Sequence, residues 1–267
     1  CGAFLARHGA RAVTSSCGTV DVCEALGVDV DCEVDVVGRS VLQAGIGLFN
    51  GMSPQVHPQG LFRILSQTGF GSILNISASL ANPMRPAFAV RGVYAREMIL
   101  PVAQTMRSIG YTQALILYGQ GTAGAGGMDE VSPLGTTWVA ELQPDGCIRE
   151  FCIQASDFGI QDPKSEILGA SGHVRAEASR ILGILCGEDQ GLGMQTVCLN
   201  AAPILILAGI AVDWSEGYEM ARQALLEGKA LQTLYTWVEK QNQTPEEGRN
   251  KLETLLREVN PRIMETA

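Results

Sequence analysis

The chain has 267 residues, of which 46% are hydrophobic and 18% charged, and its formal net charge is −9. This composition excludes a disordered chain, because the apolar residues suffice for a large core, and the length allows one large domain or two unequal ones. The acidic balance disfavours a general nucleic-acid-binding protein, which needs a basic surface. A phosphate ligand would require a local basic cluster or a divalent cation.

The cysteines and the apolar segments indicate a cytoplasmic protein. The eight cysteines show neither CxxC spacing nor a cysteine/histidine cluster of the zinc-binding type, so we expect free thiols in a reducing compartment. No secretory signal is recognisable. The longest apolar run, Val197 to Val212, is too short for a typical membrane span and predicts a buried helix. Because the first residue is Cys1, we expect a processed chain or part of a longer one.

In chain order, the first predicted element is a strand that begins near Ala6 and finishes over residues 10–13. A short helix follows over residues 19–26, with Asp21 in the first turn, where a carboxylate favours the helix dipole. Apolar residues at helical spacing predict a second helix over residues 35–46. Glycines 45, 47 and 51 then interrupt that spacing.

Strands and helices alternate farther along the chain. The predicted strands cover residues 73–76, 88–93, 114–118, 137–142 and 147–153, and the predicted helices cover residues 96–109, 174–186, 196–212, 215–227 and 231–240. Pro144-Asp145-Gly146 marks the turn of a β-hairpin. A last helix follows Thr244, with Pro245 at its first position and Glu247 at its third.

This order predicts an α/β fold, with a mostly parallel central sheet flanked by helices and a small helical lobe. We expect residues 1–18 to begin the α/β domain and residues 19–70 to belong to the helical lobe. Residues 71–243 would complete the α/β domain, and residues 244–267 would form an additional C-terminal helix.

Cationic and hydroxyl side chains gather between the first strand and the first helix. They are Arg7, His8, Arg11, Ser15, Ser16 and Thr19, accompanied by Gly9 and Gly18. Backbone N–H groups, hydroxyls and guanidinium groups that converge in this way form a cradle for an anion such as phosphate. An ordinary strand-to-helix turn is the alternative. Cys17 in the same stretch is either a reactive thiol or a small packing residue.

Two further segments could carry chemistry. Asp129 and Glu130 follow a glycine-rich loop beyond a predicted buried strand, where open α/β sheets bind ligands. Their carboxylate oxygens suit Mg²⁺ bridged to phosphates, although a solvated acidic turn is the alternative. The segment from Ser53 to Pro58, which includes Gln55 and His57, either faces a substrate or is a plain connecting loop.

Ordered matches over most of the chain make the sequence resemble the anthranilate phosphoribosyltransferase-like family, within the class that also contains nucleoside phosphorylases. The family loop reads roughly K-H-G-N-R-x-x-S-S-x-x-G-S-A-D-x-L-E-A-L-G. Here the corresponding stretch runs from Arg7-His8-Gly9-Ala10-Arg11 through Ser15, Gly18, Thr19 and Asp21 to Gly27. Other matches are Gly45-Ile46-Gly47, Asn82-Pro83, Gly92-Val93-Tyr94, Met128-Asp129-Glu130-Val131-Ser132 and Leu199-Asn200-Ala201-Ala202.

The resemblance implies a two-lobed, often dimeric enzyme of tryptophan biosynthesis that binds phosphoribosyl pyrophosphate with Mg²⁺. Pyrophosphate would leave the anomeric carbon as a small-molecule acceptor takes the phosphoribosyl group. The implied donor contacts are Arg7, His8, Gly9, Ser15, Ser16, Gly18 and Thr19. The implied metal ligands are Asp129 and Glu130.

The chain departs from the family on the acceptor side. Ala10 replaces the family asparagine, Gln55 aligns with the family histidine while His57 follows two residues later, and Leu65 aligns with the arginine that faces the acceptor carboxylate. A buried carboxylate without a cationic partner costs several kcal/mol, so anthranilate should bind poorly. The family's G-T-G-G-D and N-I-S-T motifs have no counterpart after Cys1.

Three functions remain open. The first is a phosphoribosyltransferase with a non-anthranilate acceptor, which the matched residues favour. The second is a non-catalytic binding protein, including a nucleic-acid-binding one, which the acidic charge disfavours. The third is a pyrimidine nucleoside phosphorylase, which would not require Asp129 and Glu130. We expect this chain alone to be inert with anthranilate and phosphoribosyl pyrophosphate.

Overall fold

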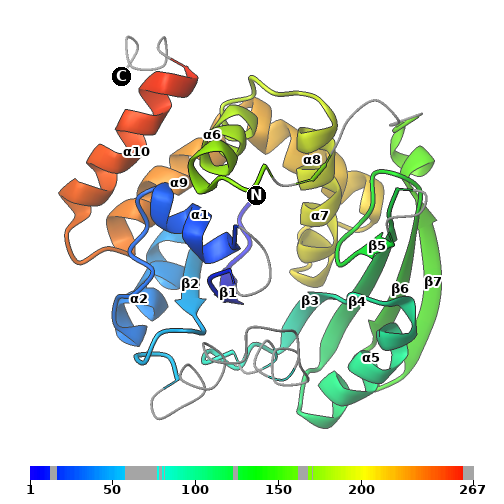
Figure 1. Ribbon diagram of the computed structural model, residues 1–267. Coiled ribbons are helices and arrows are strands. Elements are labelled where there is room, and N and C mark those ends of the chain that lie inside the picture. The colour runs from blue at the N-terminus through cyan, green and yellow to red at the C-terminus, as the bar shows by residue number, and fades with distance from the viewer. Residues whose placement is uncertain are drawn as a thin grey trace. The chain divides into compact units, whose positions relative to one another are not determined.

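The structure is a computed structural model that describes residues 1–12, 17–57, 77, 80, 82–122, 126–161, 168–169 and 171–260. Contacts divide the chain into two compact units (Figure 1). Unit 1 comprises Cys1–Ala3, Pro86–Leu168 and Gln190–Leu226. Unit 2 comprises Phe4–Arg85, Gly169–Asp189 and Glu227–Ala267. Each unit is described by itself.

Unit 1 is built on a five-stranded sheet with the order β3-β4-β6-β7, in which β5 also pairs with β4. The strands are β3 (Phe88–Gly92), β4 (Gln113–Gln120), β5 (Gly127–Met128), β6 (Thr136–Leu142) and β7 (Ile148–Gln154). β3 and β4 are parallel, whereas β5, β6 and β7 join by antiparallel pairing. The hairpin of β6 and β7 turns at Pro144-Asp145-Gly146, as predicted.

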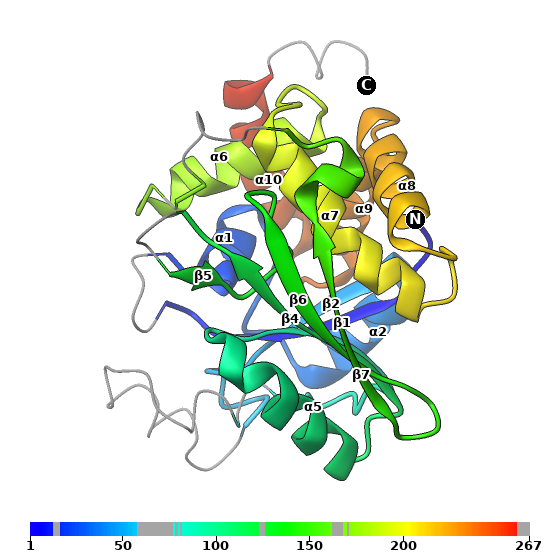
Figure 2. The same ribbon diagram turned by 90° about the vertical axis from the view of Figure 1, so that its right-hand side faces the viewer.

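Helices cover both faces of this sheet (Figure 2). They are the short η1 (Arg96–Met98) and η2 (Ala155–Phe158) and the longer α5 (Ile99–Ser108), α7 (Leu192–Leu207) and α8 (Trp214–Leu226). α5 packs against β4 and β6, and α7 packs against β3, β4 and α8. Leu115 and Leu117 of β4 share a buried cluster with Leu192 and Leu199 of α7, so alternate residues of the strand face α7.

Unit 2 contains two parallel strands, β1 (Leu5–Gly9) and β2 (Ile46–Asn50), paired from Leu5 opposite Ile46 to Gly9 opposite Asn50. Its helices are α1 (Thr19–Ala25), α2 (Val34–Ala44), α6 (Val174–Leu185), α9 (Lys229–Lys240) and α10 (Pro245–Val259). Buried residues from α1, β2, α6, α9 and α10 form one hydrophobic cluster. Segments far apart in the sequence therefore share one core.

Gln241, at the end of α9, is fully buried and binds one edge of this small sheet. Its Oε1 accepts the N–H of Leu48 at 2.8 Å, and its Nε2 donates to the carbonyl of Leu48 at 2.9 Å. The same amide accepts the indole N–H of Trp237 at 2.8 Å and donates to the carbonyl of Asp29 at 3.2 Å. A side chain thus binds both main-chain groups of Leu48 that a neighbouring strand would otherwise bind.

The last helix, α10, is an integral part of unit 2. Leu252, Leu255 and Leu256 are buried in the shared core. Its first turn touches the turn after α1 so closely that a Cβ on Gly27 would lie 2.2 Å from the carbonyl oxygen of Gly248. The helix predicted after Thr244 therefore forms and supports α1.

Many sequence predictions are confirmed, including the α/β class. The helices α1, α5, α6, α8, α9 and α10 and the strands β3, β4, β6 and β7 lie within a few residues of their predicted ranges. The strand predicted over residues 73–76 lies outside the described residues. Among the described helices, none combines the length and apolar character needed to cross a membrane. All eight cysteines are free thiols, as expected.

Other predictions differ from the structure. The first strand ends at Gly9 and does not continue over residues 10–12, and β2 was not predicted, because Ile46 continues the helical spacing of the preceding helix. The helix expected over residues 196–212 is instead α7 (Leu192–Leu207). The sheet of unit 1 is mostly antiparallel among its described pairings.

The division into units also differs from the expected domains. β1 pairs with β2, so residues 4–18 belong to the same unit as α1 and α2 rather than with β3 to β7. The expected block of residues 71–243 is split, because α6 and α9 belong to unit 2. The described residues of the range 19–57 share unit 2 with α6, α9 and α10.

Candidate functional site

The first candidate segment, here called the anion loop, comprises residues 10–18 between β1 and α1. Its described ends meet at one carboxylate oxygen, since Oδ2 of Asp21 accepts the N–H of Ala12 and the N–H of Gly18, each at 3.0 Å. A Cβ on Gly18 would lie 2.5 Å from the nitrogen of Ala12, so the two ends are in direct contact. Glycine is required there because no side chain fits.

The predicted donor contacts lie around this loop. Arg7 on β1 is exposed and donates from Nη2 to the hydroxyl of Thr19, the first residue of α1, at 3.2 Å. This hydrogen bond spans the base of the loop. Gly9 ends β1 and Gly18 precedes α1. Ser15 and Ser16 lie outside the described residues.

Arg11 is bound by three carboxylates, so its charge is already paired. Its guanidinium contacts Asp21 at 3.2 Å, Glu24 at 2.6 Å and Asp31 at 2.9 Å. The hydrogen bond to Glu24, followed by that to Asp31, raises the pKa of Arg11 further above its ordinary value. The sequence interpretation that both arginines converge on an anion is therefore wrong for Arg11.

Asp21 is ionised at neutral pH. Burial alone would raise its pKa, but the hydrogen bonds from Ala12 and Gly18, together with Arg11, lower it below the ordinary value. The neighbouring Cys17 behaves in the opposite way, because burial and then the charges of Glu177 and Asp21 raise the pKa of its thiol. A raised pKa reduces the thiolate fraction, which supports a packing role for Cys17.

The two histidines of the candidate region face each other. Nε2 of His8 lies 3.0 Å from Nε2 of His57, with the rings edge to face. A Cβ on Gly51 would lie 2.9 Å from Nε2 of His8, so Gly51 leaves room for this contact. One ring must donate and the other accept, which requires at least one neutral histidine. Burial lowers the pKa of His57, so this histidine is neutral at pH 7.

The other residues predicted to face the acceptor are Gln55, Ala10 and Leu65, and the structure shows no contact among the described ones. Gln55 is exposed, and its side-chain amide lies 3.4 Å from Glu33. Ala10 is exposed at the start of the anion loop. Leu65 lies outside the described residues. His57, rather than Gln55, thus contacts His8.

The second candidate segment, here called the acidic loop, comprises residues 129–132 of unit 1. Its main chain rests on glycines of two strands. A Cβ on Gly92 of β3 would lie 1.5 Å from the carbonyl oxygen of Asp129, and a Cβ on Gly119 of β4 would lie 2.4 Å from that of Glu130. Both acidic residues are exposed. The backbone is therefore tightly placed while its carboxylates remain accessible.

Asn200 of α7 also binds the acidic loop, and the sequence motif alone did not suggest this contact. Its Oδ1 accepts the N–H of Val131 at 2.7 Å, and its Nδ2 donates to the carbonyl of Val131 at 3.0 Å. The N–H of Ser132 donates to the hydroxyl of Thr137 at 2.9 Å. Arg91, beside Gly92, has its pKa lowered by burial, although the charge of Asp129 opposes that shift.

The acidic loop fits Mg²⁺ that is also bound by phosphates. Within the described ranges, no three histidine, cysteine, aspartate or glutamate side chains cluster as a complete metal site. Mg²⁺ is usually held by only one or two carboxylates, with water and substrate phosphates as its other ligands. Asp129 and Glu130 supply such a pair on a fixed backbone.

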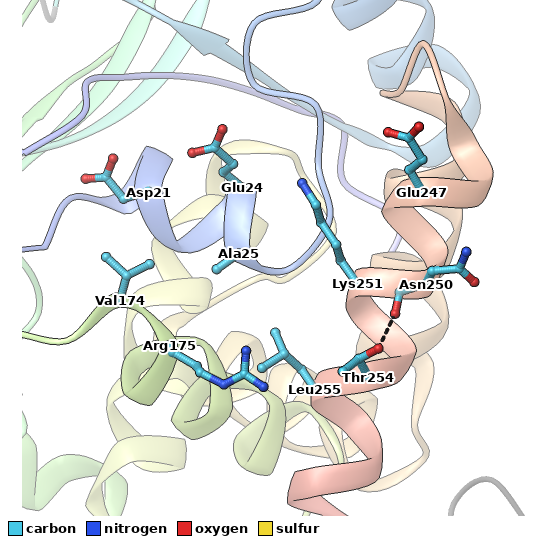
Figure 3. Close-up of a pocket in the computed structure, with 10 residues that line it drawn as sticks. All are labelled: Asp21, Glu24, Ala25, Val174, Arg175, Glu247, Asn250, Lys251, Thr254 and Leu255. Atoms are coloured by element: carbon cyan, nitrogen blue, oxygen red, sulfur yellow. Dashed lines mark hydrogen bonds between the residues drawn. The ribbon is translucent and has the colours of Figure 1, made fainter.

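An open groove of about 880 Å³ lies beside α1 in unit 2 (Figure 3). α1 contributes Asp21 and Glu24, α6 contributes Arg175, and α10 contributes Glu247 and Lys251. The carboxylate of Asp21 points away from α10. The lining mixes positive and negative side chains, and none of the predicted donor or acceptor residues lies in it. We assign no ligand to this groove.

Comparison with known proteins gives a consistent result. The family model described as the a/b domain of a glycosyl transferase family matches residues 1–231. The anthranilate phosphoribosyltransferase of Chloroflexus aggregans is 31% identical over 239 residues, which cover 89% of this chain and 68% of that protein. The one from Citrifermentans bemidjiense is 35% identical over 237 residues, or 88% of this chain and 64% of that protein. The chain spans about two thirds of these relatives.

Solved structures show the same similarity in three dimensions. Anthranilate phosphoribosyltransferase from Thermus thermophilus matches with a TM-score of 0.72 and 27% identity, covering 90% of this chain and 69% of that one. The Saccharomyces cerevisiae enzyme in complex with PRPP and Mg matches with a TM-score of 0.68 and 23% identity, covering 87% of this chain and 63% of that one. At 23% identity, the similarity to the Saccharomyces cerevisiae enzyme concerns the fold alone.

Proposed function

Because the chain belongs to the glycosyl transferase family and is related to anthranilate phosphoribosyltransferases, we propose that it binds phosphoribosyl pyrophosphate with Mg²⁺ for phosphoribosyl transfer. The observation that carries this proposal is the placement of Asp129 and Glu130, two exposed carboxylates on a backbone fixed by Gly92 and Gly119. When bound there, Mg²⁺ would neutralise charge on the pyrophosphate leaving group.

The anion loop supports donor binding through a different set of groups. Arg7 is the exposed cation at its base, since Arg11 is neutralised by carboxylates. Gly9 would contribute a main-chain donor and Thr19 its hydroxyl to the phosphates and ribose, with Ser15 and Ser16 from the same loop, whereas Gly18, whose N–H is bound to Asp21, would only let the ligand approach the main chain closely. Charge-assisted hydrogen bonds of this kind are the stronger ones in proteins. In this proposal the loop orients the donor.

For the acceptor, we propose a small molecule other than anthranilate. A carboxylate acceptor needs a cation, and residues 51–57 contain neither lysine nor arginine. His57 does not supply one, because burial keeps it neutral at pH 7 beside His8. Ala10 likewise offers no side-chain hydrogen bond. An uncharged acceptor avoids the desolvation cost of an unpaired carboxylate.

Calorimetry of phosphoribosyl pyrophosphate binding, with and without Mg²⁺, tests the donor proposal. We expect Mg²⁺-dependent binding to the wild-type chain and at least a tenfold loss of affinity in Asp129→Ala and in Glu130→Ala. Asp145→Ala, which changes an exposed turn aspartate of the same unit, is the control and should bind normally. Equal affinities in the wild type and Asp129→Ala would overturn the proposed metal site.

Anthranilate fluorescence tests the acceptor proposal. With phosphoribosyl pyrophosphate and Mg²⁺ present, we expect the purified chain to consume no anthranilate above a protein-free blank, because no described cation pairs with the anthranilate carboxylate. A bacterial anthranilate phosphoribosyltransferase run in parallel shows that the assay detects turnover. Sustained consumption by this chain would contradict a non-anthranilate acceptor.

A further inference from the structure

We propose that an apolar pocket between α1, α6 and α9 of unit 2 binds a small hydrophobic amine. The pocket has a volume of about 400 Å³, and every described residue that lines it belongs to unit 2. An engineered protein cavity of about 150 Å³ holds benzene, so the larger pocket accommodates an aromatic ring with a short side chain. Binding of an amine there does not require the proposed phosphoribosyl transfer.

The walls of the pocket are side chains of the unit 2 core. The apolar lining includes Val22, Cys23, Ile181, Leu234 and Trp237. Those on α1 and α9 are no more than 7% exposed and belong to the shared hydrophobic cluster. α6 contacts both α1 and α9 (Figure 1). The pocket therefore opens onto the core between three helices, where an apolar ligand body is removed from water.

Glu177, in the first turn of α6, is the one charged residue among the described residues that line the pocket. Its Oε1 accepts the N–H of Ser171 at 2.6 Å, whereas Oε2 lies 3.7 Å from the guanidinium of Arg180, beyond hydrogen-bond distance. The hydrogen bond from Ser171 lowers the pKa of Glu177, so this carboxylate is ionised at neutral pH. Only 14% of its side chain is exposed. Oε2 can therefore accept a hydrogen bond from a ligand.

The charge of the pocket complements a cation. Its described lining contains no lysine, arginine or histidine. Burial and then the charge of Glu177 raise the pKa of the Cys17 thiol, which also lines the pocket. An ammonium group balances this negative potential, whereas a carboxylate ligand would be repelled. A hydrogen bond between two charged groups is also stronger than one between neutral groups.

The two hydroxyl side chains of the described lining are already engaged. The hydroxyl of Thr19, which is also a proposed donor contact, accepts the hydrogen bond from Arg7 at 3.2 Å. The hydroxyl of Thr233 donates to the carbonyl of Lys229 at 2.9 Å. Glu177 is therefore the group that distinguishes a hydrophobic amine from a neutral or anionic molecule of the same size.

Calorimetry with three probes of one size tests the ligand class: phenylpropylamine, phenylpropanol and phenylpropanoate. At pH 7 we expect the amine to bind the wild-type chain about tenfold more tightly than the alcohol, because its hydrogen bond to Glu177 is charge-assisted. The carboxylate should not bind. In Glu177→Gln, which keeps an acceptor for Ser171, the amine should lose its advantage while the alcohol keeps its affinity. Glu246→Gln, at an exposed first-turn glutamate of α10, is the matched control.

A second pair of variants tests the location. Ala230→Phe adds a ring at a partly exposed lining position of α9 and should abolish binding of the amine and of the alcohol. Gln232→Phe adds the same ring to an exposed position of α9 outside the described lining and should change neither affinity. Circular dichroism shows whether each variant is folded. If Ala230→Phe does not fold, Thr233→Phe places the ring at an exposed lining position instead.

Three results would overturn the proposal. Equal affinities of the amine and the alcohol for the wild type would remove the selectivity for a cation. Unchanged amine binding in a folded Ala230→Phe or Thr233→Phe would place the amine elsewhere. A dimer that sedimentation detects without the probes, and that the amine dissociates, would show that a second copy of the chain occupies the pocket. None of these results bears on donor binding, which the Asp129→Ala experiment decides.

Discussion

In the anion loop of unit 2, the carboxylate of Asp21 holds both ends of the loop, whereas in the acidic loop of unit 1 the main chain of Asp129 and Glu130 rests directly on strand glycines. The two ends of the first loop are held by ionised side chains that are partly open to solvent, with 32% of the Arg11 side chain exposed and 20% of that of Asp21. The second is held by close packing of backbone atoms and by hydrogen bonds from the uncharged side chain of Asn200.

This difference matches the chemistry proposed for each loop. A pair of carboxylates that binds Mg²⁺ must be presented on a fixed backbone, and backbone packing is a suitable way to fix it. A segment that binds phosphates offers N–H groups and hydroxyls, and in the anion loop a carboxylate, Asp21, joins the two described ends at Ala12 and Gly18. Three substitutions test whether the two loops depend on these different forces.

Gly92→Ala should have the largest effect. The added Cβ would meet the main-chain carbonyl of Asp129, which cannot move without displacing the acidic loop. Overpacking of this kind costs about 3 kcal/mol of unfolding free energy. Urea unfolding measures this change, and Mg²⁺ binding should be lost with it. Gly38→Ala is the control, because open space surrounds Gly38 in α2; a Gly92→Ala protein as stable as this control would contradict packing as the force.

Asn200→Ala should have an intermediate effect. It leaves the N–H of Val131 without the Asn200 acceptor and also removes the donor to the Val131 carbonyl, a loss of about 2 kcal/mol. Thermal unfolding at low and high salt measures the change, which should not depend on salt because neither partner is charged. Asn250→Ala, at an exposed position of α10, should leave the stability unchanged. If the stability change of Asn200→Ala depended strongly on salt, this result would contradict the view that uncharged contacts hold the acidic loop.

Asp21→Asn should have the smallest effect on stability, about 1 kcal/mol at pH 7, and that effect should depend on pH. Since the pKa of Asp21 is lowered in the folded chain, its ionised form stabilises the fold above the ordinary aspartate pKa of about 3.9, and this contribution disappears as the pH falls through the lowered value. The charged groups around it are Arg11, Glu24 and Asp31, joined through Arg11.

Unfolding curves for the wild type and Asp21→Asn between pH 7 and pH 3 check this expectation. The two free energies should differ at pH 7 and approach each other toward pH 3. Asp35→Asn measures the contribution of a first-turn carboxylate without the loop contacts. A constant difference at every pH would show that the charge of Asp21 does not stabilise the fold.

Local signals were sufficient to predict much of the fold. Thr244 precedes α10, Pro245 begins it and Glu247 occupies its third position, so the residues from Thr244 to Glu247 suffice to predict where this helix starts. Pro144-Asp145-Gly146 likewise specifies the turn between β6 and β7. The strand β2 was missed because Ile46 fits the helical spacing of α2, while Gly45 with φ +77° ends that helix one residue earlier.

The candidate sites were predicted less completely, because their supports come from distant parts of the chain. Asn200 lies 69 residues from Val131, and no local pattern connects them. Arg11 was interpreted as a cation that binds an anion. Its carboxylate partners, Glu24 and Asp31, lie 13 and 20 residues away, so the local sequence does not reveal that its charge is already paired. The contact of His57 with His8 likewise depends on a separation of 49 residues. Composition and spacing identify the chemical groups, but tertiary contacts decide their orientation.

The position of Gln241 late in the sequence matters while the protein is being synthesised. An unpaired strand edge is a template for association with other chains, and here the amide of Gln241 occupies the N–H and carbonyl of Leu48 on β2. Because Gln241 follows Leu48 by 193 residues, the ribosome synthesises β2 long before its cap. Leu48 lacks this partner until the end of α9 emerges, so we expect chains arrested before Gln241 to aggregate more readily than the finished protein.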